Sequence, residues 1–165
     1  MATLFILMGA PGSGKSTWAS NNAASLGIDV ISRDMVRFSL VKEDEPYFSK
    51  EKEVYKEFIK RINNLLLEDK DVFADATHLT AASRNKLINS IAVPDVKLCG
   101  IWLKSSLEEC LEHNENRKGT RGYVPPEQIE KMYKSFEKPT FEEGFYSIYI
   151  KENGKTPTII YREDR

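Results

Sequence analysis

The sequence predicts an α/β fold in which helices cover both faces of a central parallel sheet. Two observations lead to this prediction. Apolar runs of strand length alternate along the chain with amphipathic runs of helix length, a pattern typical of right-handed β-α-β units. In addition, a loop rich in glycine stands between the first predicted strand and the first predicted helix. Such loops lie at the carboxyl ends of the strands, where open α/β sheets bind ligands.

The first predicted strand covers residues 3–8 (TLFILM), and a helix follows it over about residues 15–25. A second strand over residues 28–32 (IDVIS) leads into a short helical piece that runs through Leu40. The segment 48–69 predicts a long helix because its apolar residues recur at three- and four-residue spacing. That apolar stripe consists of Val54, Phe58, Ile62, Leu65 and Leu66.

The alternation continues through the middle of the chain and then stops. Strands are predicted over residues 71–76 and 96–103, and helices over residues 80–91 and 105–116. The next ten residues, RKGTRGYVPP, contain two glycines, two prolines and three basic residues. Such a composition predicts a mobile loop rather than another helix or strand.

The end of the chain predicts one more helix and a possible hairpin. The helix covers about residues 126–137, and two β-rich runs then flank Asn153-Gly154. An Asn-Gly pair between two such runs is typical of a β-hairpin, here a C-terminal extension of the sheet. Because 165 residues is the length of one ordinary domain, we expect residues 1–165 to form a single domain.

Composition limits the classes of partner. The chain has 24 basic and 25 acidic residues, whereas proteins that coat long nucleic acids are usually more basic. Any nucleic-acid contact is therefore expected to be local. Cys99 and Cys110 are expected to be buried thiols of a reducing compartment. The apolar run at residues 3–8 is too short to span a bilayer and has no basic segment before it, so we expect a cytoplasmic protein without membrane contact.

The loop after the first strand carries the octet GAPGSGKS, residues 9–16, which fits the pattern G-x-x-x-x-G-K-[ST]. Glycines let the backbone turn its N–H groups toward phosphate oxygens, and the following helix adds its positive end. In this pattern Lys15 reaches the β- and γ-phosphates of a nucleotide, and Ser16 offers its hydroxyl to Mg²⁺. The expected nucleotide-binding residues of the loop are Gly9, Pro11, Gly12, Ser13, Gly14, Lys15, Ser16 and Thr17.

Several classes of protein use such a loop, and the rest of the sequence favours one of them. A GTPase carries an Asn-Lys-x-Asp guanine reader, but Asn85-Lys86 is followed here by Leu87-Ile88. A helicase or ATPase motor is longer and ends an apolar strand in Asp-Glu, whereas DVFADA ends in Asp-Ala. Small kinases remain, and they need an acceptor site, a base and a mobile basic lid.

Charged residues stand where the second strand ends. Arg33, Asp34 and Arg37 follow that strand in the segment VISRDMVRFSL. Asp34 and Arg37 are three residues apart and can share one face of a helix. A carboxylate in this place can accept a proton from an attacking hydroxyl, while the arginine holds a phosphate with two hydrogen bonds. The spacing also fits a surface aspartate that caps a helix and pairs with the arginine, and spacing alone favours this alternative.

Four stretches occur in order and at compatible spacing: GAPGSGKSTW, ISRDMVR, DATHL, and HNENR followed by VPPEQIEKMYKSFEKPTFEEGF. With these motifs the chain, up to about Ile148, resembles the bacteriophage-type polynucleotide 5′-kinase family, including the kinase domain of eukaryotic polynucleotide kinase-phosphatases. The resemblance implies a P-loop kinase fold that uses ATP and Mg²⁺. It also implies transfer of the γ-phosphate to the 5′-hydroxyl end of DNA or RNA. Because the phosphatase motif Asp-x-Asp-x-Thr does not occur in the sequence, kinase activity alone is expected.

The resemblance also implies roles for individual residues. Asp34 becomes the base on the 5′-hydroxyl, and Arg37 contacts the phosphate on the 3′ side of the acceptor nucleotide. Asp75, in the family motif D-x-T-[NH]-L, orders the arginines or holds Mg²⁺ through water, and a role as cap of the following helix is compatible with either. Thr77 and His78 lie beside the acceptor in this picture, although His78 equally fits a satisfied polar residue at a strand end.

A basic lid completes the predicted site. The lid, about residues 113–124, is expected to close over ATP and to bring Arg117 to the transferring phosphoryl group. The family often has Arg-Asn-x-x-Arg here, whereas this chain has HNENR, so Arg121 is a second candidate for the contact with ATP. In the acceptor groove, Arg33 and Arg84 join the predicted substrate-binding residues.

Two other functions use many of the same features. A P-loop kinase for a small metabolite, nucleoside or antibiotic shares the loop, the aspartate after the second strand and the basic lid. A non-catalytic nucleotide-binding module shares only the loop. The presence of Lys15, Ser16, Asp34 and an arginine in the lid argues against that second alternative.

Overall fold

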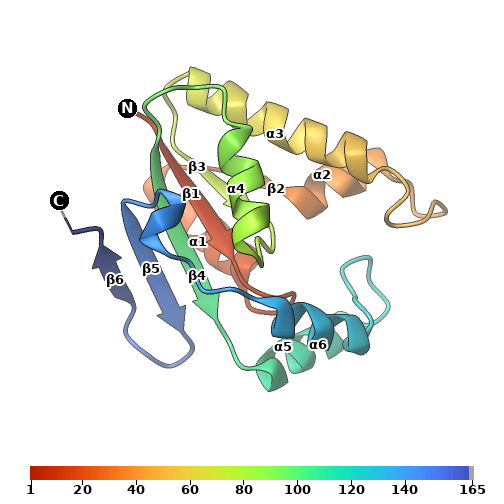
Figure 1. Cartoon of the computed structure of the whole chain (residues 1–165). Helices are drawn as coiled ribbons and strands as arrows, with labels where there is room; N and C mark the ends of the chain where they lie inside the picture. Colours follow the sequence, from red (N-terminus) through yellow and green to blue (C-terminus); the bar gives the residue numbers. More distant parts are fainter. Residues whose placement is uncertain (164–165) are drawn as a thin grey trace.

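Six strands form one sheet in the computed structural model, which describes residues 1–163 (Figure 1). The strands are β1 (Thr3–Met8), β2 (Asp29–Ser32), β3 (Val72–Asp75), β4 (Lys97–Lys104), β5 (Ser147–Glu152) and β6 (Thr158–Tyr161). Their order across the sheet is β2-β3-β1-β4-β5-β6, and every neighbouring pair is parallel except β5 and β6. The predicted α/β class is thereby confirmed. Residues 164 and 165, the last two of the predicted domain, lie outside the described part.

Helices cover both faces of the sheet, as predicted (Figure 1). They are α1 (Lys15–Leu26), α2 (Arg33–Leu40), α3 (Glu51–Leu67), α4 (Ala81–Asn89), α5 (Leu107–Glu115) and α6 (Pro126–Ser135), with a 3₁₀ turn at Phe141–Glu143. Alternate residues of β1 serve the two faces. Ile6 packs with Phe58 of α3 on one face, and Leu7 packs with Ala19 of α1 on the other, because successive side chains of a strand point to opposite sides.

The apolar stripe predicted for the long helix is the buried face of α3. Val54, Phe58, Ile62 and Leu66 are all buried, and Leu65 is half-buried at the margin of the stripe. This packing fixes α3 on the sheet. It also fixes the first turn of α3, which starts at Glu51 beside the carboxyl edge of β2.

The C-terminal run forms the hairpin that the sequence predicted. Asn153-Gly154 lies in the turn between β5 and β6, and Gly154 has a φ of 74°. That left-handed conformation strains most side chains and suits glycine. The hairpin adds an antiparallel edge strand to the parallel sheet.

The register between β2 and β3 brings the carboxyl ends of these two strands side by side. Ser32 is opposite Asp75 in the parallel pair, so the residues that follow Ser32 leave the sheet beside Asp75. Ser32 also caps α2, because its side chain accepts a hydrogen bond of 3.3 Å from the backbone N–H of Met35. The cap makes the chain turn directly from strand to helix at Arg33.

Arg84 lies in the interior, which corrects the prediction that it binds substrate. Its side chain is 0% exposed and forms an ion pair with Glu143 of the 3₁₀ turn. Its Nη1 donates to the His78 carbonyl at 2.9 Å, and its Nη2 donates to the Glu137 carbonyl at 2.9 Å. The guanidinium therefore fastens the segment before β5 to α4, and its hydrogen-bonding capacity is used inside the protein.

Both cysteines lie in the interior of the protein. Cys99 and Cys110 are both free and buried, and burial raises the pKa of the Cys110 thiol. Cys110 therefore lacks the features of a reactive thiolate. Within residues 1–163, no helix is long and apolar enough to cross a membrane.

Candidate active site

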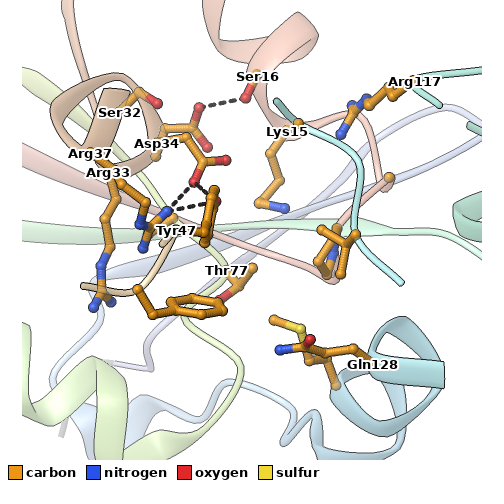
Figure 2. A pocket seen from close by; sticks show the side chains of 18 of the residues that line it. Lys15, Ser16, Ser32, Arg33, Asp34, Arg37, Tyr47, Thr77, Arg117 and Gln128 are labelled. Carbon is orange, nitrogen blue, oxygen red and sulfur yellow. Dashed lines mark hydrogen bonds and ion pairs between the residues drawn. The ribbon is translucent and has the colours of Figure 1, made fainter. Parts of the chain in front are cut away.

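A cavity of about 240 Å³ opens at the carboxyl edge of the sheet (Figure 2). Four parts of the chain line it: the glycine-rich loop with the start of α1, the start of α2 with the segment that leads into α3, the end of β3 with the residues after it, and the region from Arg117 to α6. The loop contributes Pro11, Gly12, Gly14, Lys15 and Ser16 to the wall. The predicted nucleotide half and the predicted acceptor half thus open on the same space.

The glycine-rich loop has the backbone shape that its pattern predicts. Gly14 precedes α1 with a φ of 90°, and Gly12 has a φ of 84°. A Cβ atom on Gly12 would lie 2.4 Å from the backbone oxygen of Cys110, which is too close for any side chain. Gly14 has open space on the side where a Cβ would point. The loop therefore packs tightly on α5 at one glycine and stays open at the other.

The Lys15 side chain folds back over this loop. Its Nζ donates to the carbonyl oxygen of Ala10 at 3.1 Å and lies 3.4 Å from the Ser13 hydroxyl. Burial lowers the pKa of Lys15, and the nearby carboxylates of Asp75 and Asp34 oppose that shift. The lysine therefore lies among acidic groups in a confined space, a setting in which an anionic phosphate would also hold it in the charged form.

Ser16 and Asp75 form the site's strongest candidate for a metal. The Ser16 hydroxyl donates to Asp75 Oδ2 at 2.8 Å, and Asp75 is buried at the end of β3. Burial raises the pKa of Asp75, while Lys15 acts in the opposite direction. Hydroxyl and carboxylate oxygens are hard ligands of the kind that Mg²⁺ prefers. Among residues 1–163 no cluster of three metal-binding His, Cys, Asp or Glu side chains occurs.

Asp34 is held by two neighbours on one of its oxygens. Arg37 Nη1 pairs with Asp34 Oδ1, and the Tyr47 hydroxyl donates to the same oxygen at 2.9 Å. The Asp34 side chain is 57% exposed and lines the cavity with Arg37 and Tyr47 (Figure 2). Burial and the charge of Asp34 raise the pKa of Tyr47 to about 12, so its phenol keeps the proton that it donates.

Glu51, the first residue of α3, pairs with both arginines of the acceptor side. Its Oε1 accepts from Arg37 Nε at 2.7 Å, and its Oε2 accepts from Arg37 Nη2 and from Arg33 Nη2, each at 3.1 Å. Burial acts to raise the pKa of Glu51, but the two guanidinium groups lower it overall. Glu51 therefore stays ionised and neutralises part of the positive charge that the sequence places here.

Of the two candidate arginines in the lid region, Arg117 lines the cavity and Arg121 does not. Arg117 lines the cavity, on the Lys15 side of it (Figure 2). Arg121 Nη2 instead donates to the Val41 carbonyl at 2.6 Å, and its guanidinium lies 4.5 Å from the centre of the Phe38 ring. In this arrangement Arg117 is the better candidate for a contact with bound ATP.

The remaining predicted residues support the cavity or lie next to it. Thr77 lines the cavity, and its carbonyl accepts a hydrogen bond of 3.0 Å from Gly9 N–H. Gly9 and Ser13 of the loop and Thr17 in the first turn of α1 are not among the residues that line the cavity. The buried His78 ring lies with its Nδ1 2.6 Å from the Leu7 carbonyl. Burial lowers the pKa of His78 to about 4, so the ring is neutral near pH 7 and donates its Nδ1–H to that carbonyl.

Sequence reasoning missed Tyr47 and Glu51. Tyr47 lies in the segment between α2 and α3, and Glu51 is the first residue of α3. No motif or periodicity in the sequence marks either of them. The acidic first turn of α3 was visible in the sequence, but such residues are common at helix starts because they complement the helix dipole. Glu51 approaches Arg37 through the packing of α2 against α3, and Tyr47 approaches it through the path of the segment that joins the two helices.

Residues 4–139 match the model of the AAA_33 family, described as an AAA domain, and the chain belongs to that family. Three solved structures show the same fold. A gluconokinase from Sinorhizobium meliloti 1021 is 18% identical with a TM-score of 0.60, covering 93% of this chain and 84% of that chain. Chaetomium thermophilum Kti12 in complex with ADP-AlF3 is 18% identical with a TM-score of 0.68, covering 92% and 89%. A chain of the Pnkp1/Rnl/Hen1 RNA repair complex is 24% identical with a TM-score of 0.69, covering 81% of this chain and 43% of that one.

These comparisons define the class of protein. The chain has the P-loop kinase fold, and this fold implies ATP binding. The neighbours differ in what their names say they act on: one is a gluconokinase, and another belongs to an RNA repair complex. The fold is therefore shared among them, while the acceptor has to be inferred from this chain's own site.

Proposed function

We propose that this protein is an ATP-dependent polynucleotide 5′-hydroxyl kinase, which transfers the γ-phosphate of ATP to the 5′-hydroxyl end of DNA or RNA. The observation that carries the proposal is the shared cavity. Lys15 and Ser16 of the phosphate loop and Asp34 of the acceptor side line the same space. A phosphate donor on the loop and a hydroxyl at Asp34 can therefore meet directly.

On the donor side, the loop N–H groups and the N-terminus of α1 receive the phosphates of ATP. Lys15 moves from the Ala10 carbonyl to the β- and γ-phosphates, and Arg117 offsets charge on the transferring group. Ser16 and Asp75 would hold Mg²⁺, which supplies further neutralisation of phosphate charge.

On the acceptor side, Asp34 is the base. Arg37 and Tyr47 both engage its Oδ1, which leaves Oδ2 to accept the proton of the 5′-hydroxyl. The hydroxyl oxygen forms a bond to the γ-phosphorus as the bond from that phosphorus to the β–γ bridging oxygen breaks and ADP leaves. Asp34 is thus oriented by its neighbours before the acceptor binds.

Four observations favour a polynucleotide over a small metabolite. The chain carries the ordered set of kinase motifs described above, and one structural neighbour belongs to an RNA repair complex. Arg33 and Arg37 supply the positive charge that recognises a phosphate next to the acceptor hydroxyl. A net charge of −1 suits contact with one end of a strand.

The rival function is that of a P-loop kinase for a small metabolite, nucleoside or antibiotic. One structural neighbour is a gluconokinase.

The acceptor preference tests this proposal at Arg37. A nucleoside 3′-monophosphate should be phosphorylated at its 5′-hydroxyl with a kcat/KM about 10–150 times that of the plain nucleoside, because a charge-assisted contact contributes roughly 1.5–3 kcal/mol. Arg37→Ala should collapse this ratio toward one. Both rates fall in the variant, since Arg37 also holds Asp34, and the ratio isolates the phosphate contact.

Two further variants guard this test. Arg37 is buried and paired with Glu51, so Arg37→Lys is measured together with Arg37→Ala. Lysine keeps the positive charge but lacks the planar guanidinium that can donate two parallel hydrogen bonds to a phosphate. Arg61→Ala is the matched control, because Arg61 pairs with Glu57 on α3, outside the cavity wall. Equal use of the two acceptors by the wild type would contradict the proposal.

A further inference from the structure

A second cavity of about 280 Å³ adjoins the first. Arg33 and Thr77 line both cavities, so the two spaces meet at these residues. The second cavity lies between α3 and the start of α4, with Tyr55 and Lys86 in its wall. An acceptor that enters the first cavity thus has a continuation available toward α3 and α4.

The wall of this second cavity suits an anion. Arg33 and Lys86 are its two cations, and the described residues that line it include no carboxylate. Glu51 lies outside this wall and pairs with Arg33 Nη2 at 3.1 Å, so Lys86 supplies the larger share of its net positive charge. The hydroxyl groups of Tyr55 and Thr77 add donors. Phosphate oxygens are recognised by such a combination of arginine, lysine and hydroxyl donors.

Unpaired polar atoms gather at the same place. Within residues 1–163, the buried side-chain nitrogen and oxygen atoms without a hydrogen-bond partner are Arg33 Nε and Tyr55 Oη. Both residues line the second cavity. Buried polar groups are nearly always paired, and one that is not calls for an explanation. After a small rotation of the two side chains, Arg33 Nε and Tyr55 Oη could both donate hydrogen bonds to a ligand in the cavity.

The aromatic ring of Tyr55 contacts both cations of the cavity wall. Arg33 lies 5.3 Å and Lys86 4.3 Å from the centre of this ring. The ring therefore holds two cations at the cavity, as cation–π contacts do. A phosphate would bind between positive groups that are already in place beside this ring.

We infer that the second cavity binds the next phosphate of the acceptor strand, one nucleotide beyond the phosphate assigned to Arg37. This inference rests on the proposed function and extends it: the preferred acceptor has at least two phosphates on the 3′ side of the reacting hydroxyl. Arg33 lies at the junction between the two phosphate positions. Tyr55 and Lys86 belong to the second position alone.

Two short acceptors isolate this second phosphate. One is a dinucleoside monophosphate with a free 5′-hydroxyl, and the other is the same dinucleotide with a 3′-terminal phosphate added. The wild type should phosphorylate the second acceptor with a kcat/KM about 10 times higher. Lys86→Gln should lower this preference about 2- to 5-fold, as expected of a contact with an exposed cation. Lys86→Glu, which places negative charge beside the phosphate, should lower it further.

Tyr55→Phe gives a readout that a purely structural role would not move. Because the hydroxyl makes no hydrogen bond within the described protein, its removal should leave the thermal unfolding midpoint unchanged or slightly higher. The preference for the added phosphate should nevertheless fall about 2- to 10-fold, through the lost hydrogen bond. Lys60→Gln, on an exposed turn of α3 outside both cavity walls, is the matched control and should change neither quantity.

The possible outcomes separate this inference from the function on which it rests. If the wild type phosphorylates both acceptors equally, or if Tyr55→Phe and Lys86→Glu keep the full preference, the second phosphate site is wrong while the kinase assignment stands. If neither nucleotide acceptor is phosphorylated although a small alcohol is, both are wrong. A preference in the wild type that both variants reduce supports the second site.

Discussion

Lys15→Ala should reduce phosphoryl transfer by about 10²–10³-fold while the protein remains folded. Lys15 is the one loop side chain whose ammonium can meet the β- and γ-phosphates, and loss of a single preorganised charge contact of this kind costs that order in turnover. Its contacts in the structure are to Ala10 and Ser13 of its own loop. The variant therefore loses no packing in the sheet core.

The measurement is steady-state turnover together with a thermal unfolding curve. Lys56→Ala is the matched control, because Lys56 is an exposed lysine on α3 away from the cavity wall. The control should keep wild-type turnover. A folded Lys15→Ala protein with unchanged turnover would remove the basis for placing ATP on this loop.

Asp34→Asn should lower turnover about 10²–10⁴-fold, the range for loss of a general base. Asparagine keeps the shape of the side chain and can still accept hydrogen bonds from Arg37 and Tyr47. It cannot take the proton of the acceptor hydroxyl. ATP affinity should stay close to that of the wild type, since Asp34 belongs to the acceptor half of the cavity.

Isothermal titration with ATP and turnover assays, run on the same preparations, separate these effects. Asp44→Asn is the control, because Asp44 is an exposed aspartate in the segment after α2. If Asp34→Asn loses ATP affinity in proportion to turnover, Asp34 belongs to the nucleotide or metal site and the base has to be sought elsewhere.

The fold was predictable because its signals are local. The three- and four-residue spacing from Val54 to Leu66 sets the buried face of α3, and the Asn153-Gly154 pair sets the hairpin turn. Alternation of strands and helices then leaves little choice but a parallel sheet. The loop glycines have the positive φ values that their pattern requires.

The candidate site was predictable only where a motif marks it. Glu51 contacts Arg37 through the packing of α3 on α2, and Tyr47 contacts it from the segment between these helices. The neighbours of Glu51 and Tyr47 in the sequence do not indicate either contact. Arg84 shows the opposite error. A basic residue near the acceptor segment looked like a ligand for substrate, but its partner Glu143 lies 59 residues further along the chain. Long-range pairing of this kind leaves no periodic trace in the sequence.

Labelling of a 5′-hydroxyl oligonucleotide with γ-labelled ATP tests the central claim most directly. The same enzyme is offered, side by side, the oligonucleotide, its 5′-phosphorylated form, and a panel of sugars, nucleosides and antibiotic alcohols. The account predicts label on the 5′-hydroxyl oligonucleotide, none on the 5′-phosphorylated form and little on the small alcohols. Rapid labelling of a small alcohol with none on the oligonucleotide would contradict it and would identify the protein as a metabolite kinase.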